Sequence, residues 1–315
     1  MIRFSVIIPN YNHAAFLEER IESVLKQTYQ YFDIILIDDC STDNSRPIIE
    51  KYRPHERVTV VYNAEKNSGS PFGQWQKGIS LAKNEWIWIA ESDDVALPGF
   101  LETAAKQITN DTSLWFCNSQ VKASGKEDSS TADICNKYFN TNWWSNSYSL
   151  DGKEEINRSL KYRSPVLNVS AVVFNKTALA QHRLDFRPFR YFGDWYLYLH
   201  LLGSGTVMYE HTIYNIYRRT GASHSQQMKP AHRLRLKEEY FRLLQVLMKS
   251  PVVTDKKAVL RWFNREYTGY GLRSDGIGFI GKLVIRYYSI NFRLATRVIF
   301  GSLFSKFHKR TNDQL

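Results

Sequence analysis

The sequence predicts an α/β fold in which a mixed, mostly parallel sheet lies between helices. Over residues 1–200, short apolar runs alternate with segments of helical periodicity, as successive β-α-β units require. One apolar run, residues 34–37, stops at Asp38 and Asp39, and another, residues 86–90, stops at the acidic segment 91–94. Because the carboxyl ends of parallel strands share the sheet edge where ligands bind, we expect both acidic clusters to face one site.

The individual elements follow from apolar periodicity and from capping residues. Residues 6–8 form a continuous apolar strand that ends at Pro9, and apolar residues then recur at helical spacing over residues 17–25. The polar cluster 41–43 suits the cap of a helix that begins near Arg46. We therefore expect strands at residues 6–8, 32–38, 58–61, 86–90, 114–117 and 169–174, and helices at residues 17–25, from 46, 74–82 and 195–202.

Residues 123–157 interrupt this alternation, since Ser, Asn, Asp and Lys predominate and aromatic residues are scattered. We expect a long irregular stretch there. Aromatic residues in such a stretch either line a sugar or base site or pin a loop to the core. Both interpretations apply to Tyr138, Phe139, Trp143 and Trp144.

Length and charge predict one large domain with an appendage. The chain has 315 residues, of which 43% are apolar, enough for a sizeable core. Its formal net charge is +11, and residues 229–315 hold 18 Lys and Arg against 6 Asp and Glu. We therefore expect an α/β domain at residues 1–228 and a basic helical C-terminal region at residues 229–315.

The basic region contains a predicted amphipathic helix. Its polar face carries Lys282, Arg286, Arg293 and Arg297, opposite an apolar face. Such a helix lies on an anionic membrane surface or packs on protein with its charges in water, and both interpretations stay open. No recognition motif accompanies the charge, so nucleic acid is not an expected partner.

The cysteines and the N-terminus bear on the cellular compartment. Cys40, Cys117 and Cys135 have neither zinc-ligand nor redox spacing, and an odd number argues against a disulfide framework. The first strand begins within a few residues of Met1, without a leader, and no apolar window has the length of a bilayer span. We expect a cytoplasmic protein, attached peripherally to the inner face of the cell membrane if the basic helix binds lipid.

The acidic strand end predicts a cation and a phosphate. Adjacent carboxylates at the end of a buried strand are unfavourable unless a positive charge lies between them. The first turn, residues 9–13, lacks the glycines with which a helix N-terminus binds pyrophosphate, which disfavours a Rossmann dinucleotide enzyme. A diphosphate therefore needs another counter-charge. Mg²⁺ or Mn²⁺ held by Asp94 would supply it, because these ions take carboxylate and phosphate oxygens.

Several motifs, taken in order, resemble those of the family 2 glycosyltransferases of the GT-A fold over residues 3–225. They are FSVIIPNYN at residues 4–12, SVLKQT at 23–28, DDCSTD at 38–43, ESDD at 91–94, GDW at 193–195, YRR at 217–219 and SHS at 223–225. Each motif is weak alone, but their order and spacing are specific. Residues 1–228 are accordingly expected to be a GT-A catalytic domain. Two positions depart from the family pattern: Glu91 stands where aspartate is common, and residues 74–76 (QWQ) replace the usual Arg-Asn pair.

On the donor side, the resemblance implies a role for each matched residue. Asp39 would accept a hydrogen bond from the imide N–H of the nucleobase, and the segment from Pro9 to Tyr11 would line the base pocket. Asp93 would contact the ribose, and Asp94 would hold the metal that bridges the two phosphates. Taken without the resemblance, Asp39 is also a candidate helix cap.

On the acceptor side, the resemblance implies that Asp194 is the catalytic base, which removes the proton of the attacking hydroxyl. From the residues alone, Asp194 precedes an apolar helix and is a candidate N-cap. Arg218, Arg219 and His224 would close over the diphosphate, or else lie solvated.

Together these roles imply an inverting, metal-dependent transfer of a sugar from a nucleotide diphosphate sugar, by default a UDP sugar. The acceptor is expected to be a hydroxyl of a glycan or lipid-linked glycan in surface polysaccharide or lipopolysaccharide biosynthesis. One alternative is an inactive GT-A domain that serves as a glycan-binding or scaffolding subunit, which the presence of the four aspartates disfavours. A second alternative is a sugar nucleotidyltransferase. Such enzymes generally carry a glycine-rich, basic first turn, unlike residues 9–11.

Overall fold

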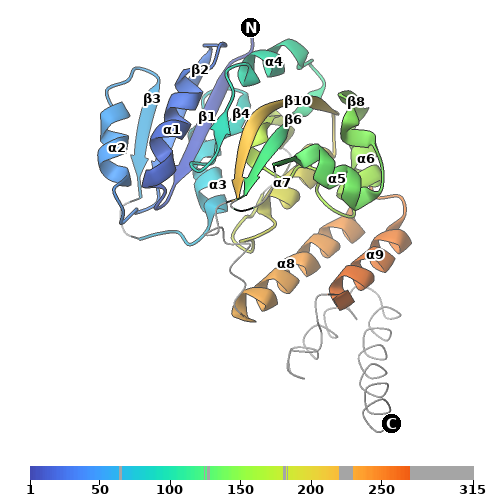
Figure 1. Cartoon of the computed structure of the whole chain (residues 1–315). Coiled ribbons are helices and arrows are strands. Elements are labelled where there is room, and N and C mark those ends of the chain that lie inside the picture. Colours follow the sequence, from blue (N-terminus) through green and yellow to red (C-terminus); the bar gives the residue numbers. More distant parts are fainter. Residues whose placement is uncertain are drawn as a thin grey trace. The chain divides into compact units, whose positions relative to one another are not determined.

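A computed structural model describes residues 1–63, 66–123, 125, 128–179, 182, 184–219 and 230–269. The chain forms two compact units, Met1–Glu239 (unit 1) and Tyr240–Leu315 (unit 2). The change of charge along the sequence suggested a boundary after residue 228, whereas the compact units divide after Glu239. Unit 1 contains the sheet and the helices that cover it (Figure 1).

The sheet of unit 1 is mixed, as the sequence predicted. Among the described residues it has ten strands, and their order along the main path is β3-β2-β1-β4-β9-β6-β10-β5. The first four strands of this path are parallel neighbours, while β9 is antiparallel to both β4 and β6. The strands are β1 (Phe4–Asn10), β2 (Phe32–Asp38), β3 (Val58–Tyr62), β4 (Trp86–Ile89), β5 (Val95–Ala96), β6 (Thr112–Ala123), β7 (Ser129–Ser130), β8 (Tyr148–Asp151), β9 (Val172–Asn175) and β10 (Thr206–Arg219).

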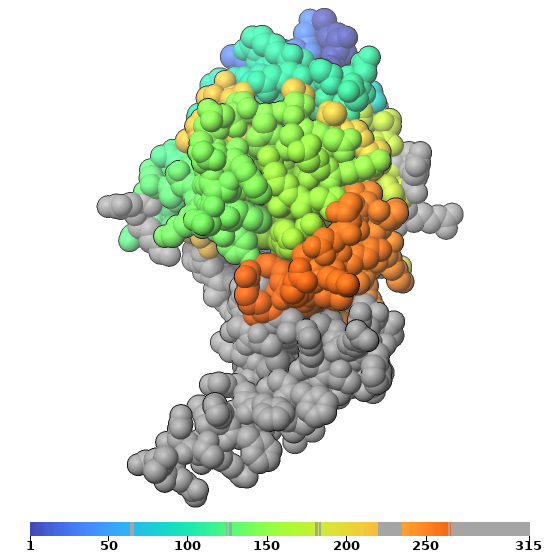
Figure 2. Space-filling model, turned by 90° about the vertical axis from the view of Figure 1, so that its right-hand side faces the viewer, coloured from blue at the N-terminus to red at the C-terminus, as the bar shows by residue number. Residues whose placement is uncertain are grey.

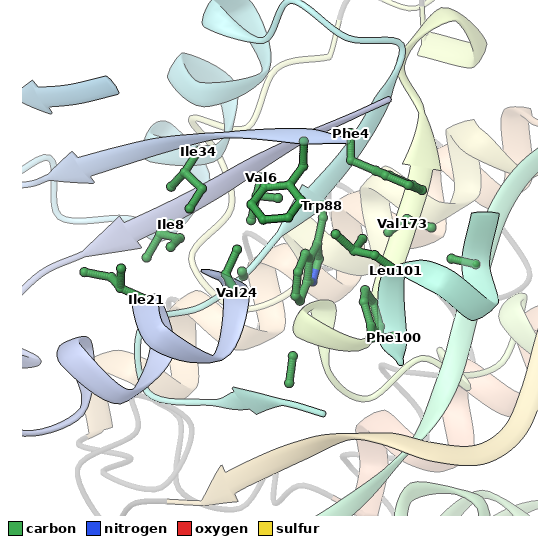
Figure 3. Close-up of a cluster of buried hydrophobic side chains, with 14 of the residues drawn as sticks. Phe4, Val6, Ile8, Ile21, Val24, Ile34, Trp88, Phe100, Leu101 and Val173 are labelled. Carbon is green, nitrogen blue, oxygen red and sulfur yellow. The ribbon is translucent and has the colours of Figure 1, made fainter. Parts of the chain in front are cut away.

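One face of the sheet is covered by α1 (Ala14–Leu25), α2 (Ser45–Tyr52) and α4 (Phe100–Gln107). Alternate residues of β1 point into this layer, where they meet apolar residues of the helices and Trp88 of β4 (Figure 3). Burying one such side chain contributes about 1.5–3 kcal/mol to folding. The side chains labelled in Figure 3 are Phe4, Val6, Ile8, Ile21, Val24, Ile34, Trp88, Phe100, Leu101 and Val173.

The opposite face of the sheet carries α3 (Pro71–Leu81), and α7 (Gly193–Leu201) contacts α3 at its beginning. Gly78 lets α3 lie directly on β1, because a Cβ there would come within 2.4 Å of Ile7 Cγ2. The sheet therefore lies between two layers of helices, which confirms the predicted arrangement.

The prediction of a long irregular stretch at residues 123–157 was wrong. A helix, α5 (Thr131–Phe139), begins at a capping box formed by Ser130 and Asp133, and a second helix, α6 (Gly152–Glu155), follows β8. Trp144 is buried and lies 5.2 Å from the ring of Phe139, so these aromatics pack on one another. This part of the chain is green in Figure 2, where it forms much of the surface of unit 1 that faces the viewer.

Short helical turns complete unit 1, and helices continue into unit 2. The turns are η1 (Trp143–Ser145), η2 (Ile156–Leu160), η3 (Val169–Ala171) and η4 (Lys176–Leu179). Helix α8 (Pro230–Lys249) begins in unit 1, and α9 (Lys256–Gly269) belongs to unit 2, in agreement with the expected helical C-terminal region. The predicted amphipathic helix around Lys282–Arg297 lies outside the described residues. Within the described part of the chain, no helix combines the length and apolarity that crossing a bilayer requires.

Candidate active site

The carboxyl ends of β1, β2 and β4 meet at one cavity. Asn10 at the end of β1 pairs in register with Asp38 of β2, and Ile7 pairs with Ile89 of β4, so the loops after these strands share one edge. The cavity has a volume of about 600 Å³, within the usual range for small-molecule sites. Its lining includes the predicted site residues Pro9, Tyr11, Asp39, Asp93, Asp94, Asp194 and Arg218. Arg219, the last residue of β10 (Thr206–Arg219), is not part of this lining, and His224 lies outside the described residues.

Asp94 is fixed at the end of the acidic segment by two hydrogen bonds. The backbone N–H of Arg218 donates to Oδ1 at 2.9 Å, and Asn168 Nδ2 donates to Oδ2 at 2.8 Å. Burial, and to a smaller extent the neighbouring charge of Asp93, raises the pKa of Asp94 to about 6. The charged form of Asp94 is therefore held in a defined orientation but disfavoured by its surroundings.

A buried arginine lies behind the acidic segment. Arg20 of α1 is fully buried, and its Nε donates to the carbonyl oxygen of Glu91 at 2.8 Å. Its two terminal nitrogens have no hydrogen-bond partner among the described residues, and its guanidinium lies 5.8 Å from the Trp88 ring centroid. Burial lowers the pKa of Arg20 to about 10, although the charges of Asp94, Asp93 and Glu91 oppose this.

Sequence reasoning missed Arg20, although a signal was present. A cationic residue stands between Leu17 and Ile21, within the apolar stripe of α1, where the helix faces the core. Within the described part of the chain, no salt bridge joins Arg20 or Arg218 to Asp93 or Asp94. One buried positive charge thus lies near three carboxyl groups.

The composition of the cluster fits a hard divalent cation. Carboxylate oxygens are the ligands that Mg²⁺ and Mn²⁺ prefer, and such ions commonly take one or two carboxylates together with phosphate oxygens. No group of three or more His, Cys, Asp or Glu side chains suited to a metal is found among the described residues. Asp93 and Asp94 are the carboxylates of this edge that could hold such an ion.

Glu91 contacts the other segment that departs from the family pattern. Trp75 Nε1 of α3 donates to Glu91 Oε1 at 2.7 Å. Burial, and to a smaller extent the charge of Asp93, raises the pKa of Glu91 to about 8. Trp75 belongs to the QWQ segment, so the two departing positions contact each other and form part of one cavity wall.

Asp39 lies on the cavity wall, where a polar loop surrounds its carboxylate. Asn63 Nδ2 donates to Oδ1 at 2.5 Å, and Ser68 donates from its backbone N–H at 3.0 Å and from its hydroxyl at 2.6 Å. Asn67 Nδ2 adds a further donor at 3.1 Å. Helix α2 has Asn44 at its N-cap, so Asp39 binds the loop instead of capping this helix.

Asp194 lies in the first turn of α7, one residue inside the helix, whose N-cap is Phe192. Its Oδ1 accepts a hydrogen bond from the backbone N–H of Trp195 at 2.7 Å. Burial raises the pKa of Asp194 to about 6. The carboxylate therefore faces the cavity with a raised basicity, as expected for a group that accepts a proton.

The position of Asp194 depends on close packing between α7 and α3. A Cβ on Gly193 would come within 2.6 Å of the Phe72 ring, so only glycine lets the start of α7 approach α3 this closely. Just before the helix, Arg190 lines the same cavity, and its buried Nε has no hydrogen-bond partner among the described residues. Sequence reasoning did not identify Arg190.

Arg218 is placed at the cavity but is already paired. Its Nη2 donates to Glu19 Oε2 at 2.6 Å, and its guanidinium lies 5.5 Å from the Phe16 ring centroid. Its backbone N–H, rather than its side chain, contacts Asp94.

Solved structures with this fold include two glycosyltransferases. The TarS fragment 1–349 of Staphylococcus aureus, in complex with UDP-GlcNAc, superposes with a TM-score of 0.70 at 18% identity, covering 93% of this chain and 83% of TarS 1–349. The mannosyltransferase PcManGT of Pyrobaculum calidifontis, in complex with GDP-Man and Mn²⁺, gives a TM-score of 0.55 at 12% identity, covering 94% of this chain and 83% of that one. The fold is therefore of the GT-A type.

Sequence comparison extends the likeness from fold to family. The glycosyltransferase GlyG of Streptococcus pneumoniae is 42% identical over 105 residues, which span 33% of this chain and 34% of GlyG. The match therefore covers about a third of that relative's length. The family profile described as glycosyl transferase family 2 matches residues 5–182, more than half of the sequence. The chain belongs to glycosyl transferase family 2.

Proposed function

We propose that this protein is an inverting, metal-dependent glycosyltransferase that uses a nucleotide diphosphate sugar, with UDP as the nucleotide. The observation that carries the proposal is the convergence of Asp94 and Asp194 on one cavity from distant parts of the chain. An acidic strand end suited to a cation and a carboxylate of raised basicity are the two groups that sugar transfer from a diphosphate requires.

Asp194 is the proposed general base. Inversion requires that the acceptor hydroxyl attack from the side opposite the leaving diphosphate, and the attacking oxygen must lose its proton. A carboxyl group with a pKa of about 6 is ionised at neutral pH yet more basic than an ordinary aspartate. Asp194 can therefore accept the proton from the hydroxyl at the pH of the cell.

The donor is proposed to bind at the edge formed by β1, β2 and β4. Asp94 would hold Mg²⁺ or Mn²⁺ beside Asp93, and such an ion supplies positive charge to the departing diphosphate when bound. Asp93 is proposed to contact the ribose, while Pro9 and Tyr11 line the base pocket. The two solved relatives, bound to UDP-GlcNAc and to GDP-Man with Mn²⁺, support a nucleotide sugar and a divalent ion.

Asp39 can bind the nucleobase of the donor only if its present hydrogen bonds change. Its two oxygens already accept four donors from Asn63, Asn67 and Ser68, and two carboxylate oxygens offer about four lone pairs. An imide N–H can therefore bind Asp39 only if one of these donors leaves. We propose that the loop around Ser68 yields this donor when the nucleotide enters.

The acceptor is proposed to be a hydroxyl of a glycan or lipid-linked glycan that becomes part of a surface polysaccharide or lipopolysaccharide. We propose that the enzyme acts in the cytoplasm, at the inner face of the cell membrane. The basic predicted helix around residues 282–297 would attach it to anionic lipid. His224 and Arg218 remain proposed contacts of the diphosphate.

Calorimetric titration with UDP, GDP, CDP, ADP and dTDP, each with and without Mn²⁺, tests this function. We expect one nucleotide to bind, with an affinity at least about tenfold higher when Mn²⁺ is present. In Asp94→Asn the effect of Mn²⁺ should disappear. Asp111→Asn, which alters an exposed carboxylate outside the cavity lining, should behave as the unmodified protein. Binding of none of these nucleotides would overturn the proposal.

A turnover assay separates the proposal from its alternatives. A glycosyltransferase releases the nucleoside diphosphate from a panel of nucleotide sugars in the presence of an acceptor. A sugar nucleotidyltransferase instead releases pyrophosphate from a nucleoside triphosphate and a sugar phosphate. A protein that binds the nucleotide but releases neither product, with every acceptor tested, would be a glycan-binding subunit.

A further inference from the structure

The backbone just before α7 is held by a buried carboxylate from α8. Glu239 has no exposed surface, and Oε1 accepts a hydrogen bond from the backbone N–H of Arg190 at 2.7 Å. Oε2 accepts from the N–H of Tyr191 at 2.7 Å and from that of Phe192 at 3.1 Å. Three consecutive amides therefore converge on one carboxylate, and all of these residues belong to unit 1.

This arrangement constrains the residues that lead into Asp194. Successive backbone N–H groups form a concave anion site, and the N-terminus of a helix favours negative charge. Hydrogen bonds to an ionised carboxylate are short and strongly directional, so they fix the path of residues 190–192. Gly193 and Asp194 follow directly, and the Phe72 ring packs against Gly193 from α3.

We propose that Glu239 is a positioning residue for catalysis: by binding the three amides before α7, it sets the direction in which Asp194 and Arg190 face the cavity. The inference rests on the proposed function of Asp194 as the base. Glu239 lies outside residues 5–182, which the family profile covers, and the acidic and basic motifs of the sequence do not include it. The catalytic unit thus needs the first part of α8 to complete its site.

The electrostatic surroundings of Asp194 provide a specific readout. The negative charge of Glu239 raises the pKa of Asp194, although burial is the larger cause. Its partner on α8, Arg235, lies 3.4 Å from Glu239 Oε1. Among the described residues, Tyr198 on its own helix and Tyr217 on β10 also interact with Asp194. The charged groups that line the same cavity include Glu91, Asp93, Asp94, Arg190 and Arg218.

The test compares Glu239→Gln with the unmodified protein. We expect kcat to fall by about tenfold to a hundredfold because the base is misplaced, while the dissociation constant of the nucleotide stays within about twofold. The acidic limb of the pH profile, where kcat falls as the pH is lowered, should also move to lower pH. Removal of a nearby negative charge lowers the pKa of Asp194. A residue that only stabilised the fold would lower the melting temperature without moving this limb. The other groups named above are present in both proteins. The difference between the two pH profiles of kcat therefore reports the loss of the Glu239 charge.

Two further variants serve as controls. Glu210→Gln removes another buried carboxylate that accepts a backbone N–H, from Thr212, but it lies away from the cavity lining, so kcat and its pH dependence should not change. Glu239→Asp keeps the charge but shortens the side chain by one methylene group. It should lower kcat while leaving the acidic limb closer to its original pH than Glu239→Gln does.

Hydrogen exchange of residues 186–196 gives a readout that does not depend on turnover. Faster exchange of the amides of Arg190, Tyr191 and Phe192 in folded Glu239→Gln would support the inference. Unchanged exchange, or an unchanged kcat and acidic limb in a folded variant, would overturn it. An unmodified protein without any transfer activity would instead contradict the proposed function, and the exchange measurement would still decide whether Glu239 holds this segment.

Discussion

Asp94 and Asp194 make an informative comparison, because burial is the main cause that raises the pKa of each to about 6, whereas the charges around them differ. Asp94 is buried and also adjoins Asp93, whose charge adds to the effect of burial. Asp194 has no carboxylate neighbour in the sequence, and burial dominates, with Glu239 a smaller contribution. A cation beside Asp94 and Asp93 would relieve the repulsion between these adjacent carboxylates, whereas Asp194 has no adjacent carboxylate with which to share a cation. The two regions are therefore suited to different tasks.

The two carboxylates also differ in how they are held. Asp94 accepts one hydrogen bond on each oxygen, from Arg218 and from Asn168. Among the hydrogen bonds described, Asp194 accepts one from the N–H of Trp195 on Oδ1. A metal ligand benefits from a rigid carboxylate, while a base needs an oxygen that remains available to the incoming hydroxyl.

The largest expected effect comes from removing the base. In Asp194→Asn we expect kcat to fall by about 10²-fold to 10⁴-fold, because no group then accepts the proton of the acceptor. The affinity for the nucleotide should not change, since the role proposed for Asp194 concerns the acceptor. Steady-state kinetics and calorimetry on the same preparation check both expectations.

Asp94→Asn should show the opposite pattern, with donor binding lost first. If both variants lost donor affinity equally, the division of labour between the two carboxylates would be wrong.

A smaller effect is expected from pH. Asp194 must be ionised to act as a base, so protonation below a pKa of about 6 removes the active form. At saturating donor, acceptor and Mn²⁺, kcat should be level above pH 7 and fall toward about one tenth of that value near pH 5. Donor binding, measured at each pH by calorimetry, shows whether the metal site contributes. A kcat that does not change between pH 7 and pH 5 would exclude a base with this pKa.

The same contrast between the two regions explains what the sequence could predict. The strand at Phe32–Asp38 and the acidic end of β4 were predicted because each depends on a continuous local pattern. The family motifs then placed Asp39, Asp94 and Asp194 at one site, and the structure brings all three to one cavity. Local pattern and parallel topology together determine this edge of the sheet.

The supports of the site could not be predicted because they depend on contacts between distant segments. Nothing near Glu239 in the sequence indicates that its carboxylate meets the amides of residues 190–192. Arg20 is recognisable only as an exception to an apolar stripe, and its contact with Glu91 joins α1 to the segment that follows β4. Helix α5 was missed because its polar composition resembles that of a loop, although Ser130 and Asp133 give a capping signal.

The smallest effect on turnover, and one that isolates packing from charge, is expected from Gly193→Ala. The added Cβ would lie 2.6 Å from the Phe72 ring, which cannot easily withdraw because it packs against Trp75 at 4.7 Å and stacks on Phe186 at 6.0 Å. We expect the free energy of unfolding to fall by about 1–3 kcal/mol, the usual cost of overpacking. Denaturant unfolding measures this change, and kcat should fall by a few fold because α7 shifts relative to the acidic edge.

Gly73→Ala is the matched control for this substitution. Its Cβ would meet nothing closer than Ser68 Oγ at 3.7 Å, and alanine favours a helix over glycine by up to about 1 kcal/mol. The control should therefore be neutral or stabilising, with kcat unchanged. A smaller side chain at position 72, in the double variant Gly193→Ala, Phe72→Leu, should restore part of the lost stability, because leucine leaves room for the new methyl group. If Gly193→Ala unfolded at the same denaturant concentration as Gly73→Ala, close packing of α3 on α7 would not be what places Asp194, and the amides held by Glu239 would have to position the base without it.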